Sequence, residues 1–90
     1  MNKIEILLGT LPASAQDIAD LFRLQGIRGV PKDVTGCPIA TYLKEGGVLA
    51  PIVGGTIAYV KAGGLCVEMP KGCSEFVGKF DCGYYPDLKA

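Results

Sequence analysis

The chain has 90 residues, which is the size of one small domain rather than of several. Hydrophobic residues make up 49% of it, so the chain can form a core and does not have the composition of a disordered protein. Nine basic residues balance nine acidic residues, and without a positive excess a role in nucleic-acid binding is disfavoured. We therefore expect residues 1–90 to form a single globular domain.

No hydrophobic run reaches the roughly 20 residues that a membrane-spanning helix requires. Residues 1–5 place a lysine and a glutamate around the start of a hydrophobic run, which is unlike a signal peptide. We therefore expect a cytoplasmic protein with no membrane segment. In that compartment four cysteines are more typical of free thiols than of disulfides, although zinc binding and pairing both stay open.

Two helices are predicted before residue 27. Residues 3–11 match helical spacing at four hydrophobic positions and strand spacing at three, so the pattern favours a helix and leaves a strand open. A second helix begins after Ser14, a good N-cap residue, and ends at Gly26. Ile27 is expected to fold back on Phe22, as in a Schellman motif. One face of this helix is predicted to consist of Ile18, Leu21, Phe22 and Gln25, with Leu24 beside it.

A third helix is predicted to begin between Thr35 and Cys37. Pro38 lies in its first turn, where a missing N–H costs no hydrogen bond, and the adjacent Gly46 and Gly47 end it. The predicted buried face of this helix consists of Ile39, Ala40, Tyr42 and Leu43. The two preceding helices and this one therefore fill most of the first half of the chain.

Residues 48–69 change to the pattern of strands. Pro51 limits the first hydrophobic run to an edge strand, because proline cannot donate a hydrogen bond to a neighbouring strand. Residues 56–60 and 65–69 are predicted to pair as a hairpin, and residues 61–64 have the composition of its turn.

A last helix is predicted over residues 74–82, and Gly83 ends it. Its buried face is expected to consist of Cys73, Phe76, Val77 and Phe80. The order of elements predicts an α+β fold with two or three N-terminal helices, a small antiparallel hairpin or three-stranded sheet, and a C-terminal helix.

Histidine is absent from the chain, which removes the most common general base and the most common metal ligand. The glycine pairs do not match the motifs of phosphate-binding loops, and turns or helix ends account for them. We therefore expect a protein with no enzymatic activity and no cofactor.

Cys37 is the one side chain whose local sequence suggests tuned chemistry. A thiol at a helix N-terminus can have a lowered pKa, which would make Cys37 a reactive thiol. The alternative, which we favour, is a small residue packed where the helix meets the preceding segment, because no second cysteine follows at C-x-x-C spacing. The four cysteines could also bind zinc, although their intervals lack the close pairs of structural zinc sites.

Tyrosine and aspartate side chains form the candidate interaction surface, because tyrosine is large, rigid and half-polar, as interfaces often require. The residues of this surface are Tyr42, Asp81, Tyr84, Tyr85 and Asp87. The alternative is that one or two of the tyrosines seal the core. We expect a protein partner, and a homodimer is compatible with the sequence.

A winged-helix DNA-binding protein is a second interpretation, because helices followed by a hairpin could form that fold with Lys61 on the wing. The third predicted helix argues against it, since it offers only Lys44 beside Glu45 and no run of side chains that could read a DNA groove.

Residues 37–43 (CPIATYL) and 80–88 (FDCGYYPDL), together with the helix end between Ile18 and Gly29, resemble short uncharacterised proteins of bacteria and of phages or other mobile elements. This resemblance implies a cytoplasmic accessory protein, and proteins of that origin often bind and modulate a host protein. It implies no particular activity and no site residues.

Overall fold

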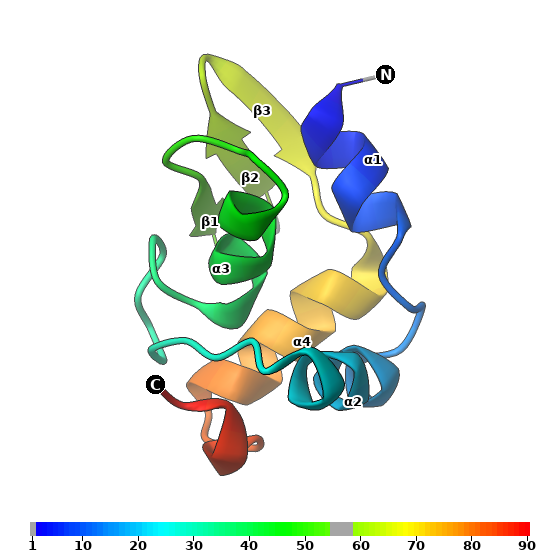
Figure 1. Ribbon diagram of the computed structural model, residues 1–90, viewed down its shortest axis with the longest axis vertical. Coiled ribbons are helices and arrows are strands. Elements are labelled where there is room, and N and C mark those ends of the chain that lie inside the picture. The colour runs from blue at the N-terminus through cyan, green and yellow to red at the C-terminus, as the bar shows by residue number, and fades with distance from the viewer. Residues whose placement is uncertain (1, 55–58) are drawn as a thin grey trace.

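A computed structural model describes residues 2–54 and 59–90, and within these ranges it confirms the α+β fold (Figure 1). Four α-helices, a three-stranded antiparallel sheet and one short 3-10 helix make up the structure. In chain order the elements are α1 (Lys3–Gly9), α2 (Ala15–Gln25), α3 (Pro38–Glu45), β1 (Ile52–Gly54), β2 (Tyr59–Ala62), β3 (Leu65–Glu68), α4 (Lys71–Asp81) and the 3-10 helix η1 (Pro86–Leu88).

The first segment is a helix, which decides between the two patterns that the sequence left open. The side chain of Asn2 accepts a hydrogen bond from Glu5 N at 2.9 Å and so caps α1. Ile4 and Leu8 lie one turn apart and are both buried. Helical spacing thus places Ile4 and Leu8 toward the core, whereas Ile6 is 51% exposed.

Helix α2 begins and ends where the sequence predicts. Ser14 Oγ accepts a hydrogen bond from Asp17 N at 3.1 Å, and Gly26 takes a left-handed conformation with φ of 71°. Ile27 N then donates to the carbonyl oxygen of Phe22 at 2.9 Å, as the Schellman motif requires.

The face predicted for α2 coincides only in part with its buried face. Gln25 is exposed and Leu24 is 85% exposed, whereas Ala15 and Ala19 are buried. The small alanines suit the close packing of α2 against α4, where the rings of Phe22 and Phe76 meet edge to face with centroids 5.3 Å apart. Figure 1 shows α2 and α4 side by side.

The sheet has the order β1-β2-β3, and β1 is the edge strand that Pro51 predicts. The hairpin between β2 and β3 turns at Gly63 and Gly64, which have φ of 57° and 82°. Positive φ at both positions is the requirement of a type I′ turn, whose twist suits antiparallel strands. Of the strand predicted over residues 56–60, the part before Tyr59 lies outside the described residues.

Helix α4 begins at Lys71, three residues before its predicted start, because Cys73 N and Ser74 N already donate to the Pro70 carbonyl oxygen. Its predicted face of Cys73, Phe76, Val77 and Phe80 is buried. After Gly83 the chain folds back, so that η1 places Leu88 in the core and Gly29 N donates to the Leu88 carbonyl oxygen at 2.8 Å.

Candidate interaction surface

Cys37 occupies the N-cap position of α3, as the sequence indicates, but its side chain is buried and only 2% exposed. Its Sγ accepts a hydrogen bond from Ala40 N at 3.4 Å. Burial raises the pKa of the Cys37 thiol above its ordinary value and outweighs the hydrogen bonds from the first turn, which act in the opposite direction. This is the position of a packed structural cysteine, and the pKa shift is opposite to that of an activated thiol.

Asp81 lies at the end of α4 beside a small pocket of about 30 Å³ that also borders Cys37. This volume suits about one water molecule. The Asp81 carboxylate accepts a hydrogen bond at 2.8 Å from the backbone N–H of Lys32, a residue held in the left-handed region with φ of 64°. Asp81 therefore fixes the turn that precedes α3.

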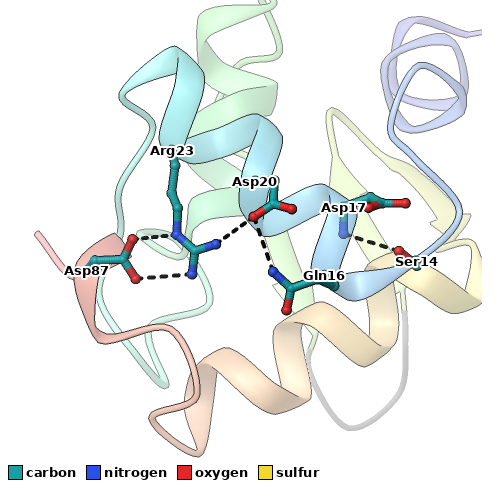
Figure 2. Close-up of polar contacts among 6 residues, drawn as sticks. All are labelled: Ser14, Gln16, Asp17, Asp20, Arg23 and Asp87. Carbon is teal, nitrogen blue, oxygen red and sulfur yellow. Dashed lines mark hydrogen bonds and ion pairs between the residues drawn. The ribbon is translucent and has the colours of Figure 1, made fainter.

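Asp87 likewise accepts hydrogen bonds from another residue of the chain. Figure 2 shows its carboxylate facing the guanidinium of Arg23, with hydrogen bonds of 2.5 Å from Nε and 3.2 Å from Nη2. Arg23 Nη1 also donates to Asp20 at 2.7 Å. The hydrogen bonds from Arg23 hold the pKa of Asp87 below its usual value. The pair joins η1 to α2.

The three tyrosines of the candidate surface lie in different environments. Tyr85 is 5% exposed and stacks on Phe76, whereas Tyr84 is 66% exposed, with the ammonium of Lys79 at 6.0 Å from its ring centroid. Tyr42 is half-buried, and its hydroxyl forms a hydrogen bond with the Thr10 hydroxyl. Of the three rings, only that of Tyr84 is mainly exposed, and Tyr85 seals the core.

The structure contains a more apolar candidate that the sequence analysis did not identify. We call it the hairpin hollow: an open depression of about 260 Å³ between α1, the segment after α3 and the tip of the β2–β3 hairpin. Its lining consists of Lys3, Ile4, Gly47, Val48, Leu49, Ala62, Gly63 and Leu65. Leu49 is 86% exposed at this hollow and Leu65 is 48% exposed. The only signal in the sequence was a hydrophobic pair, Val48 and Leu49, directly after a helix stop.

Metal binding and DNA binding are further interpretations of the sequence, and the residues on which they depend lie within residues 2–54 and 59–90. All four cysteines are free thiols, and no three His, Cys, Asp or Glu side chains of these residues are grouped so as to hold a metal ion. On α3, Lys44 Nζ donates to the Thr35 carbonyl oxygen at 2.7 Å. Among the described helices, none is both long and apolar enough to cross a bilayer.

Comparisons of the chain with protein-family models, with curated proteins and with solved structures found no match in any of the three.

Proposed function

We propose that the chain is a protein-binding module with no catalytic activity of its own, and that it contacts its partner through the hairpin hollow. The observation that carries this proposal is the exposure of Leu49 beside the half-exposed Leu65. Complete burial of one leucine side chain contributes about 1.5–3 kcal/mol. Grouped apolar side chains around a depression are typical of protein-interaction sites.

The hairpin hollow is a better candidate than the tyrosine and aspartate surface because its exposed leucines, Leu49 and Leu65, are not part of the core. Asp81 and Asp87 accept hydrogen bonds from Lys32 and Arg23, and Tyr85 lies in the core. A partner that used these groups would have to break existing contacts first. Tyr84 remains a second candidate contact, which the same experiment tests.

The test is affinity capture with the purified chain, followed by measurement of the dissociation constant for each captured protein. Leu49→Ser and Leu65→Ser should weaken binding at least about tenfold, as expected for central interface residues. Leu24→Ser is the matched control, since Leu24 is 85% exposed on α2 and does not line the hollow. It should bind as the unmodified chain does.

Two results would count against this proposal. If Tyr84→Ala abolishes binding while Leu49→Ser leaves it intact, the contact lies at the C-terminal segment instead. If the unmodified chain captures no protein and also does not associate with itself, the protein-binding function itself fails.

A further inference from the structure

The outer edge of β3 has backbone groups with no partner in the described part of the chain. β3 pairs only with β2, in a register that sets Leu65 opposite Ala62 and Val67 opposite Val60. In a hairpin with a two-residue turn, the residues that flank the turn form a hydrogen-bonded pair, and every second pair does so. Leu65 and Val67 therefore bond to β2, whereas the N–H and C=O groups of Cys66 and Glu68 point outward.

A hydrogen bond at the opposite edge of the sheet, that of β1, independently supports this alternation. Because Val60 bonds toward β3, the same rule requires Val53, its partner on β1, to point its backbone away from β2. Val53 N does donate to the Val34 carbonyl oxygen outside the sheet, at 2.8 Å. The segment before α3 thus bonds to the edge of β1, whereas no described backbone group outside the sheet forms a hydrogen bond with Cys66 or Glu68 at the edge of β3.

We propose that β3 pairs with β3 of a second copy of this chain, antiparallel and centred on Val67, so that the two sheets join. This inference rests on the proposed protein-binding function and names the partner. In this register Cys66 lies opposite Glu68 of the second copy, and Glu68 lies opposite Cys66 of the second copy. Both residues of each pair have outward-pointing groups, so each pair exchanges both of its N–H···O=C bonds.

The side chains on the exposed face of the sheet complement each other in this register. Lys61 is the neighbour of Cys66 on β2, and Lys61, Cys66 and Glu68 are all exposed. Glu68 of the second copy would lie two strand spacings from Lys61, roughly 10 Å between Cα atoms. The intervening cysteine is small, and the long lysine and glutamate side chains can meet across it. Because the proposed dimer has two-fold symmetry, this ion pair forms twice.

The opposite face of the sheet is apolar in the same register. Val67 is half-buried, and it would meet Val67 of the second copy as a non-hydrogen-bonded pair, in which side chains approach most closely. Leu65, on the same face and 48% exposed, extends the apolar contact toward the hairpin hollow. A second copy is therefore complementary to the edge of β3 in its backbone hydrogen bonds, its charged side chains and its apolar side chains. An arbitrary extended segment need not be complementary in all three.

The first test is the mass of the chain in solution, measured by sedimentation from micromolar to millimolar concentration. A monomer–dimer equilibrium is expected. Lys61→Glu and Glu68→Lys should each weaken dimerisation about fivefold or more, because each variant brings like charges together twice. An equimolar mixture of the two variants should restore dimers, since both ion pairs of the mixed dimer are again of opposite charge.

This mixing experiment separates the contact between copies from any effect within one chain, because no change inside a single chain can restore association on mixing. Lys79→Glu is the control, since Lys79 lies on α4 and outside the sheet. It should dimerise like the unmodified chain. Failure of the mixture to associate better than either variant alone would overturn the proposed register.

Amide hydrogen exchange tests the edge itself. The Leu65 and Val67 amides should be protected at all concentrations, whereas those of Cys66 and Glu68 should gain protection only as dimers form. A dimer in which Cys66 and Glu68 exchange freely would overturn the inference, and so would a chain that is monomeric throughout. A monomeric chain that still captures another protein through Leu49 would leave the proposed function standing and refute only the choice of partner.

Discussion

The ring of Tyr85 stacks on the ring of Phe76, with centroids 5.3 Å apart and planes 11° from parallel. Tyr84, its neighbour in sequence, points its ring into solvent. Truncation of Tyr85 to alanine should therefore lower the free energy of unfolding by about 3–5 kcal/mol, as for other buried aromatic residues. Tyr84→Ala should change it by less than about 0.5 kcal/mol. Urea unfolding of both variants checks this, and equal losses would contradict the packing described for the tail.

Two glycines of α4 should respond in opposite directions to alanine. At Gly72 a Cβ atom would lie 2.2 Å from the carbonyl oxygen of Ala13, so Gly72→Ala must push α4 away from the segment before α2. Such overpacking costs about 1–3 kcal/mol. At Gly78 a Cβ atom would meet nothing within 4 Å, and Gly78→Ala should stabilise the helix by about 0.5–1 kcal/mol. Thermal unfolding measures both, and a stabilising Gly72→Ala would show that α4 and this segment are not in contact.

The ion pair between Arg23 and Asp87 predicts a dependence of stability on pH. The pKa of Asp87 is lower in the folded chain than in the unfolded chain, chiefly because Arg23 donates hydrogen bonds to it. The stabilisation is therefore complete above the unfolded pKa of about 3.9 and is lost as the pH falls through the lower folded value.

The measurement is the difference in unfolding free energy between the unmodified chain and Asp87→Asn, followed from pH 6 downward. This difference should shrink below about pH 4. In a chain that already carries Arg23→Met, Asp87→Asn should change the unfolding free energy little at any pH. A difference that is constant through this range would mean that Arg23 does not stabilise the ionised carboxylate.

The four thiols should fall into two classes of reactivity. Burial raises the pKa of Cys73 to about 11 and also raises that of Cys37, whereas Cys66 and Cys82 are exposed. Near pH 8 a thiol reagent should modify Cys66 and Cys82 rapidly, and it should reach the other two only when the chain unfolds. Mass spectrometry of peptides identifies each site. Rapid modification of Cys37 in the folded chain would revive the reactive-thiol interpretation.

The same two buried thiols should make the fold less stable at alkaline pH. Their pKa values are higher in the folded chain than in the unfolded chain, so the neutral form is favoured by folding. The resulting stability is complete below the unfolded pKa of about 8.5 and is lost as the pH rises toward the folded value. Cys73→Ala should remove part of this alkaline loss, which unfolding at pH 8 and pH 10 would show.

Many boundaries of the secondary structure were determined by the sequence itself, because the groups responsible lie within a few residues of each other. Ser14 caps the helix that follows it, Gly26 ends that helix, and Cys37 with Pro38 starts the next. A turn residue acts in the same local way, as at Gly63 in the hairpin. These local hydrogen bonds and backbone preferences do not depend on the rest of the fold.

Only the tertiary structure decided which of several equivalent side chains meet the core. Nothing local distinguishes Tyr84 from Tyr85, and their burial depends on the direction in which the chain turns back after Gly83. The same holds for Gln25 on α2, which is exposed although it was predicted to share a face with Phe22, because the position of α4 selects a different face.

The candidate site could not be predicted from the sequence either. The hairpin hollow combines Ile4, Leu49 and Leu65 from three separate segments. The exposed edge of β3 exists because the sheet ends there and the described chain supplies no further strand. Local preferences act over a few residues, but a surface is formed by whatever the packing of distant segments leaves uncovered. That is why the fold class could be predicted from the sequence and the location of the candidate surface could not.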